Sequence, residues 1–174
     1  VSIDAAHRMH RQVTALVEAS PFAILSADRE GVLMSWNRAA ERIFGYTAAE
    51  AVGRIPPILI DEESYHRRRT AAVVPQSQIV EYRHKDGRTV VSRLSATRNP
   101  TSEPGWTMMA LIEDVTSEVA ERSAQATLTA AVEQAGEAIV VTTPEPAIIY
   151  ANPAALASSG YMFEEVIGQN PRIF

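Results

Sequence analysis

An internal repeat constrains the fold of this chain more than any other feature. When the sequence is shifted by about 115 positions, its end matches its beginning without a gap over about 40 residues. The matched pairs include Val17 and Val132, Asn37 and Asn152, Gly45 and Gly160, Tyr46 and Tyr161, Glu50 and Glu165, Gly53 and Gly168, and Pro56 and Pro171. The period is far too long for a solenoid unit. The sequence therefore predicts a duplicated domain, of which the second copy stops at Phe174 after about half its length.

The first copy opens with a predicted helix and a predicted hairpin. Residues 4–19 carry apolar side chains at helical spacing, and Ser20-Pro21 ends that helix. The apolar runs 22–27 and 32–36 flank a turn that ends in glycine, which favours two antiparallel strands.

Short helices with clear capping signals follow this hairpin. Asn37 can N-cap a helix over 38–44, and Gly45 suits the left-handed position that ends it. Thr47 and Glu50 have capping-box spacing for a second short helix. The remaining signals are Gly53, which closes the second helix, and Asp61, which caps a predicted helix over 61–73.

Three longer strands and a helix complete the copy. The strands are predicted over 76–84, 88–98 and 106–116, with Lys85-Asp86-Gly87 as the turn between the first two. Residues 117–135 return to helical periodicity. Two strands, several short helices and three more strands predict an α+β fold, with a five-stranded antiparallel sheet and the helices on one face.

This order of elements resembles the PAS domain, the sensory module of bacterial signalling proteins. The resemblance rests on Asn37, Gly45-Tyr46, Glu50 and Gly53, on Lys85-Asp86-Gly87, and on the closing Asp114-Val115-Thr116. It implies four regions: an N-terminal helix at 1–20, a PAS domain at 21–117, a connecting signalling helix at 118–135, and the beginning of a second PAS domain at 136–174. It also implies a sensor that binds a small ligand or cofactor and regulates a C-terminal effector, a histidine kinase or a diguanylate cyclase or phosphodiesterase.

Composition excludes several classes of function. The net charge is −5, with 46% hydrophobic and 21% charged residues, which gives no electrostatic reason to expect nucleic acid or anionic membrane as a partner. No apolar run approaches the roughly 18 residues of a membrane span. Cysteine is absent, which excludes disulfides and thiolate chemistry. A start at Val1 without a signal peptide predicts a cytoplasmic piece of a longer protein.

Catalytic motifs are missing as well. The sequence has no phosphate-binding glycine loop, nucleophile elbow or zinc-binding helix motif. Asp61, Glu62 and Glu63 are consecutive, so they cannot share one helix face as paired catalytic carboxylates. They are typical of an acidic helix N-terminus. We expect no enzymatic activity in this region.

The resemblance brings cofactor hypotheses with it. Light-sensing LOV members need a cysteine where this chain has Pro56 and Pro171, so their photochemistry is excluded, while non-covalently bound flavin is not. His66 lies where haem-binding PAS sensors carry the iron ligand, so it is the one candidate metal ligand, and only if haem binds. The alternative interpretation is an exposed histidine beside a solvated run of arginines at 67–69.

The candidate ligand-contacting residues are His66, Trp36, Ile24, Phe44, Leu59 and Met109. Leu33, Ile43, Val52, Ile58, Val90, Leu94 and Leu111 are expected to fill or line the same interior. Met108 and Met109 must lie on opposite faces of their strand, so one of them points inward. Trp36 is either cavity wall or ordinary core, and an apolar core without any ligand is the competing hypothesis. His7, His10 and His84 are interpreted as solvent-facing.

Signal transfer and dimerisation involve the two longer helices. The candidate relay residues are Asp114 and Thr116, at the start of the connecting helix, together with Glu50 and Lys85. Glu50 is predicted to form a surface ion pair with Lys85 or Arg83. Val13, Leu16 and Val17 match Leu128, Ala131 and Val132 in the repeat, which gives each copy the same apolar stripe on the helix before it. The sequence favours a homodimer through the N-terminal helix. The alternatives are a stripe that packs on its own sheet, and a dimerisation or spacer module that binds no ligand.

Overall fold

The computed structural model describes residues 3–70, 77–98 and 107–174. The predicted helix end at 71–73 and the loop containing Pro100, Pro104 and Gly105 lie outside these ranges. The chain divides into two compact units, Val1–Ser117 and Glu118–Phe174, which are treated separately below.

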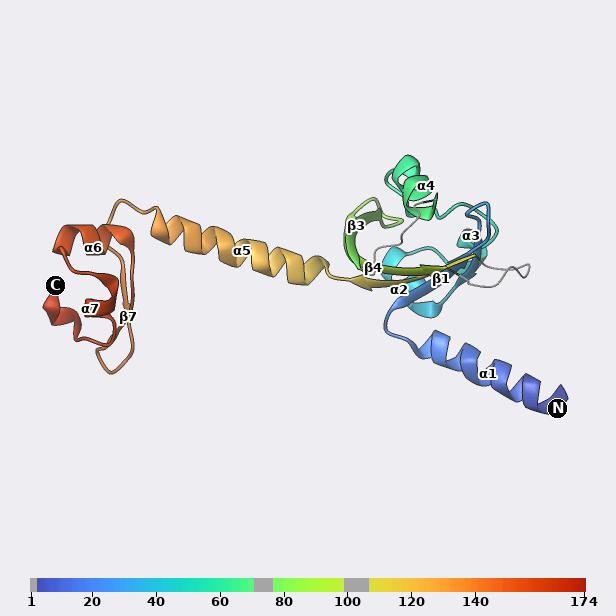
Figure 1. The fold of residues 1–174 in the computed structure, drawn as a ribbon, viewed down its shortest axis with the longest axis horizontal. Helices are drawn as coiled ribbons and strands as arrows, with labels where there is room; N and C mark the ends of the chain where they lie inside the picture. The colour runs from blue at the N-terminus through green and yellow to red at the C-terminus, as the bar shows by residue number, and fades with distance from the viewer. Residues whose placement is uncertain (1–2, 71–76, 99–106) are drawn as a thin grey trace. The chain divides into compact units, whose positions relative to one another are not determined.

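The first unit contains a five-stranded antiparallel sheet (Figure 1). Its elements are α1 (Ile3–Ala19), β1 (Ala23–Ala27), β2 (Leu33–Trp36), α2 (Arg38–Phe44), α3 (Ala48–Ala51), α4 (Glu62–Thr70), β3 (Gln78–Arg83), β4 (Thr89–Arg98) and β5 (Met108–Asp114). The strand order is β2-β1-β5-β4-β3, so the two N-terminal strands extend a meander formed by the last three. The predicted α+β fold is confirmed.

One hydrophobic core joins the inner face of the sheet to the short helices. Every strand contributes to this core, and so do α2, α3 and the segment between α3 and α4. Its buried members are Ala23, Leu25, Leu33, Trp36, Ala40, Phe44, Ala51, Ile58, Tyr82, Val90, Leu94, Ala110 and Ile112. Because one face of the sheet shares its core with α2 and α3, these helices lie on the same side, as predicted.

Asn37 organises the entry into α2. Its side-chain oxygen accepts hydrogen bonds from the amides of Ile24 at 2.9 Å and Ala40 at 3.0 Å. Its side-chain nitrogen donates to the carbonyls of Val17 at 2.8 Å and Phe22 at 3.0 Å. One buried amide therefore caps α2, holds the start of β1 and fastens the last turn of α1 to the domain.

The other predicted caps are also present. Gly45 ends α2 with φ of 78°, a left-handed conformation that favours glycine. The carboxylate of Glu50 accepts hydrogen bonds from the Thr47 amide at 2.9 Å and the Thr47 hydroxyl at 3.1 Å, which fixes the start of α3. The carboxylate of Asp61 accepts from the amides of Glu63 and Ser64 at the start of α4.

The second unit repeats the beginning of the first. It comprises most of α5 (Thr116–Glu133), then β6 (Val140–Thr142), β7 (Ile148–Ala151), α6 (Pro153–Ser159), α7 (Phe163–Val166) and a 3₁₀ turn (Pro171–Ile173). The side chain of Asn152 accepts from the amides of Ile139 and Ala155 and donates to the carbonyls of Val132 and Glu137. These four partners lie 115 residues after the four partners of Asn37, so the matched positions have matched contacts.

Four expectations about exposure were wrong. Met109, Leu111 and Val52 are 39%, 37% and 39% exposed, so they do not fill the interior. In β5 the inward positions belong to Ala110 and Ile112, and strand alternation therefore turns both Met109 and Leu111 outward. Val52 follows the last residue of α3, at a turn that faces solvent.

His84 is the fourth correction. Its side chain is only 15% exposed, because the imidazole packs over the end of α2. A Cβ atom on Gly45 would lie 2.7 Å from Cε1 and Nε2 of this ring, so only glycine allows so close an approach. His7 and His10, by contrast, are exposed on α1 as predicted.

Candidate functional site

A small cavity lies between the inner face of the sheet and α4. Its volume is about 40 Å³. Ten apolar residues form most of its wall: Leu25, Ala27, Pro56, Ile58, Leu59, Leu94, Ala96, Met108, Ala110 and Ile112. The segment before α4 is held against β3, because the amide of Arg83 donates to the carbonyl of Ile58 at 2.8 Å. A backbone hydrogen bond therefore holds the segment that carries Pro56, Ile58 and Leu59 against the sheet.

Four polar residues complete the cavity wall. Tyr65 and Arg68 come from α4, and Gln78 and Tyr82 come from β3. The Tyr65 hydroxyl donates to the carbonyl of Gly31 at 2.8 Å, which fixes α4 to the β1–β2 turn. Tyr82 is 5% exposed, and burial raises the pKa of its hydroxyl to about 12. The phenol is therefore neutral and can donate a hydrogen bond.

An aromatic cluster lies beside the cavity within the core. The ring of Phe44 lies 5.7 Å from that of Trp36 and 5.6 Å from that of Tyr82, measured between centroids. The indole nitrogen of Trp36 donates to the carbonyl of Tyr46 at 2.9 Å. Trp36 and Phe44 are thus buried core residues outside the cavity wall, and Tyr82 connects them to the cavity.

The other predicted contact residues are divided between the cavity and the surface. Leu59 lines the cavity. Met108 lines it in place of Met109, which faces the opposite side of β5. Ile24 is half-buried and alternates with Leu25, so it faces the opposite side of β1. His66 is exposed on α4 and does not line the cavity.

Sequence reasoning missed the polar part of the wall. Tyr65 and Arg68 are three residues apart, which places them on one side of α4. Gln78 and Tyr82 have the same parity in β3, which places them on one face of that strand. Both signals can be read in the sequence. However, nothing in the sequence indicates that the face of α4 would meet the face of β3.

Haem does not fit this site. Pockets for drug-sized ligands and cofactors usually measure roughly 300–1,000 Å³, whereas this cavity measures about 40 Å³. The only candidate iron ligand, His66, is exposed and lies outside the cavity wall. The described ranges also contain no group of three or more acidic or histidine side chains that could hold a metal ion.

The predicted relay residues Asp114 and Thr116 connect β5 to the first turn of α5. The carboxylate of Asp114 accepts from the Thr116 amide at 3.0 Å and from the Thr116 hydroxyl at 2.6 Å. The same hydroxyl accepts a hydrogen bond from the amide of Val91 in β4 at 3.0 Å, and the amide of Val115 donates to the carbonyl of Val91 at 2.9 Å. The start of α5 is therefore fastened to two strands of the sheet.

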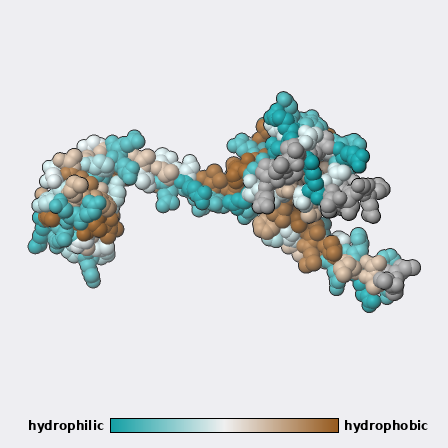
Figure 2. All heavy atoms as spheres, viewed as in Figure 1, coloured by the Kyte–Doolittle hydropathy of each residue, from teal (hydrophilic) through white to brown (hydrophobic). Residues whose placement is uncertain are grey.

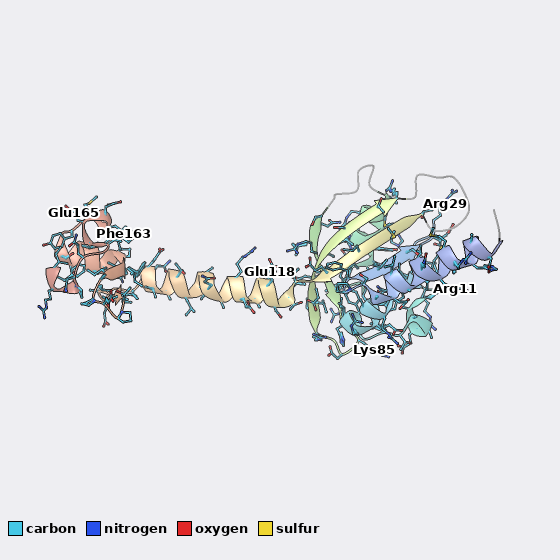
Figure 3. The ribbon with its side chains drawn as sticks, turned by 90° about the horizontal axis from the view of Figure 1, so that it is seen from below. Arg11, Arg29, Lys85, Glu118, Phe163 and Glu165 are labelled. Atoms are coloured by element: carbon cyan, nitrogen blue, oxygen red, sulfur yellow. The ribbon has the colours of Figure 1, made fainter. Side chains whose placement is uncertain are left out.

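The second predicted relay pair connects α3 to the β3–β4 hairpin. The ammonium group of Lys85 lies 2.5 Å from a carboxylate oxygen of Glu50, and Figure 3 shows Lys85 at this hairpin. The pKa of Glu50 is lowered to about 2, chiefly by its hydrogen bond to Lys85 and then by the bond from the Thr47 amide. Both side chains are nearly half exposed, so the ion pair fixes the position of the hairpin more than it stabilises the fold.

Comparison with known proteins identifies the family. Residues 11–111 match the family model described as the PAS fold, and residues 136–174 match a second model described as a PAS domain. The chain belongs to the PAS family. PAS domains are sensory modules rather than catalytic ones. Among the helices that the structure describes, none combines the length and apolarity needed to cross a membrane.

The relatives of this PAS chain include signalling proteins. It is 28% identical to the oxygen sensor protein DosP of Escherichia coli (strain K12), over 86% of this chain and 20% of DosP. The chain thus spans a fifth of the length of that relative. The crystal structure of the PAS domain of an HTR-like protein from Haloarcula marismortui has a TM-score of 0.55 and 22% identity, over 64% of this chain and 95% of that one.

A third relative comes from a histidine kinase. A domain of the sensory box sensor histidine kinase/response regulator from Geobacter sulfurreducens has a TM-score of 0.50 and 20% identity, over 63% of this chain and 96% of that one. At this level of identity, the two structural likenesses establish the fold alone.

Proposed function

We propose that this chain is the sensory region of a signalling protein, in which the first PAS unit binds a small ligand and α5 carries the response to an effector. The effector class is a histidine kinase, or a diguanylate cyclase or phosphodiesterase, and the chain itself catalyses no reaction. One observation carries the proposal: β5 both lines the cavity and leads into α5. Ala110 and Ile112 lie in the cavity wall, and Asp114 begins the contacts that hold α5 to the sheet.

This arrangement gives a ligand a short route to the helix. A molecule against Ile112 would touch the strand two residues before Asp114. A small displacement of β5 would change the hydrogen bond between the Thr116 hydroxyl and the Val91 amide. The equilibrium of α5 between two discrete arrangements would then shift. The match of Asn152 to Asn37 supports a second PAS unit as the next element in the signalling path, with 118–135 as the connecting helix.

Homodimerisation through α1 is the second part of the proposal. Met9, Val13 and Leu16 are 62%, 51% and 73% exposed, which leaves the apolar stripe of α1 uncovered by its own sheet. Figure 2 shows hydrophobic surface over the C-terminal half of α1. A parallel helix pair would bury this stripe. The only charged side chain in the first turn of α1 is Asp4, so that end adds little repulsion to the pairing.

The test is ligand-dependent hydrogen exchange at α5. A thermal-shift screen of small metabolites supplies the ligand, and the exchange of amides 116–133 is compared with and without it. We expect Thr116→Ala and Asp114→Ala to abolish the ligand-dependent change while the ligand affinity stays nearly constant. Loss of affinity in parallel with the exchange response would contradict the relay role.

The competing function is a dimerisation and spacer module without a ligand, and the small volume of the cavity favours it. A chain that responds to no compound but dimerises through α1 would support this alternative. An absorption spectrum recorded with added hemin tests the haem hypothesis: a Soret band that disappears in His66→Ala would contradict the fit argument given above.

A further inference from the structure

The polar residues of the cavity wall lie together, next to a second hollow. An outer hollow of about 280 Å³ adjoins the cavity, and the two share Leu59, Arg68, Gln78 and Tyr82. Apart from these shared residues and Tyr65, the inner cavity is apolar, so the site as a whole becomes more polar at the shared residues. A molecule that fits both parts has an apolar body and a polar head.

The charge at this boundary comes from Arg68. Its side chain is half-buried, and it makes no hydrogen bond or ion pair within the ranges that the structure describes. Two of the acids at the start of α4 pair with the neighbouring arginine, because Arg67 lies 2.9 Å from Glu63 and 3.7 Å from Asp61. A partly buried guanidinium without a counter-charge is costly, and an anionic group supplies the missing partner.

A second hydrogen-bond donor points to the same kind of head group. Tyr82 is 5% exposed and lines both the cavity and the outer hollow. The phenol lies close enough to Arg68 for the positive charge to act on it. A guanidinium and a neutral phenol both donate hydrogen bonds, and a carboxylate accepts from both.

The acids that line the outer hollow limit where the anion can lie. Asp61 is bonded to the Ser64 hydroxyl and to backbone amides, which lowers its pKa and keeps it ionised. Glu81 projects from β3 beside the hollow. These two carboxylates disfavour an anion at the outer rim, so the favourable position is the boundary beside Arg68 and Tyr82.

We propose that the first PAS unit selects a small monocarboxylate with an apolar body, whose carboxylate binds Arg68 and Tyr82 and whose apolar part enters the cavity. This inference rests on the proposed ligand-binding function and adds the chemical class of the ligand. The inner volume of about 40 Å³ restricts the buried part to a few carbon atoms, so short aliphatic or simple aromatic acids are the class that fits.

The experiment measures binding of matched acid and neutral pairs to the 174-residue chain by calorimetry and thermal shift. The probes are benzoate with benzamide, and hexanoate with hexanol, at up to millimolar concentration. We expect each acid to bind about tenfold or more tightly than its neutral counterpart, because hydrogen bonds to charged groups are the stronger ones. Arg68→Gln should remove this preference, and Tyr82→Phe should reduce it.

Arg67→Gln is the matched control. This arginine lies next to Arg68 on the same helix, but it is 62% exposed and does not line the cavity. It should leave the preference for acids unchanged, and equal effects of the two arginine changes would overturn the assignment to Arg68. Circular dichroism of each variant establishes that it folds.

The remaining outcomes separate this inference from the proposed function. Neutral probes that bind as tightly as the acids, with no effect of Arg68→Gln, would overturn the carboxylate class and leave ligand sensing intact. Absence of binding by all four probes would also overturn it, and the metabolite screen with α5 hydrogen exchange would then decide separately whether the unit senses any ligand.

Discussion

Asn37 offers the sharpest test of how the first PAS unit is held together. Its side chain is 1% exposed and makes four hydrogen bonds, to the amides of Ile24 and Ala40 and to the carbonyls of Val17 and Phe22. Asn37→Ala removes all four bonds and leaves their partners without a replacement. At about 1 kcal/mol for each bond, with a further penalty for groups that stay buried, we expect the free energy of unfolding to fall by about 3–5 kcal/mol.

A second substitution separates the parts of this role. The hydroxyl of Asn37→Ser can still accept from the Ala40 amide and cap α2, but it is too short to reach the carbonyl of Val17. We therefore expect Asn37→Ser to recover only about 1 kcal/mol relative to alanine, the usual contribution of an N-cap. Full recovery would mean that capping alone explains the residue and that the link to α1 contributes nothing.

The assay is urea denaturation followed by tryptophan fluorescence. Both tryptophans, Trp36 and Trp106, precede residue 118, so this signal reports the first unit alone. Asn152→Ala is the matched control, because it breaks the same contacts in the second unit and should leave the fluorescence transition unchanged. A loss smaller than about 1 kcal/mol for Asn37→Ala would refute the reasoning, since it would fall below the usual cost of losing a single cap.

Three further changes test other parts of the first unit by the same assay. Gly45→Ala should destabilise the first unit by more than Gly53→Ala. Both glycines have positive φ, so either alanine would cost about 1–2 kcal/mol in backbone strain, but only at position 45 would the new Cβ also meet the imidazole of His84. Ser92→Ala should stabilise by about 1 kcal/mol, because the buried Ser92 hydroxyl has no partner among the described residues; a loss of stability would show that it has one. Glu50→Gln should make the free energy of unfolding depend less on pH in acid. The Glu50 carboxylate stabilises the fold fully above its unfolded pKa of 4.5, and this effect is lost as the pH falls through its folded pKa of about 2. An unchanged dependence on pH would contradict this.

Local signals allowed most of the fold to be predicted. Asn37 and Gly45 could be assigned as caps because each end of a helix depends on a few neighbouring residues. The residue types preferred at these positions can be recognised in the sequence itself. The same holds for Asp61 and for the turn at Gly87, where φ is 94°. The internal repeat then showed that these signals occur together as a unit and not by coincidence.

The site was harder to predict because it depends on which faces meet. Strand alternation established that Met108 and Met109 point to opposite sides, but the choice between them requires knowing which face of β5 is covered. In the structure, Ala110 and Ile112 are buried and alternate with more exposed neighbours. Met108 lies on the same face of the strand as these two residues, so it is Met108 that points inward. Arg68 was interpreted as part of a solvated arginine run, since its position beside Tyr82 depends on the packing of α4 over β3, which local pattern does not encode.

The contacts at the two ends of α5 support its proposed role as the link between the two units. At its N-terminal end, the Thr116 hydroxyl is bonded to Asp114 and to Val91 of the sheet. Near its C-terminal end, the carbonyl of Val132 accepts a hydrogen bond from the side chain of Asn152, as the carbonyl of Val17 in α1 does from Asn37. Each PAS unit thus holds the helix that precedes it by a buried asparagine, and the first unit also holds the helix that follows it. Because Thr116 and Val132 lie on one continuous helix, a movement of β5 would act on the first turn of the same helix whose last turn Asn152 holds, and hydrogen exchange along 116–133 would show how far the effect extends.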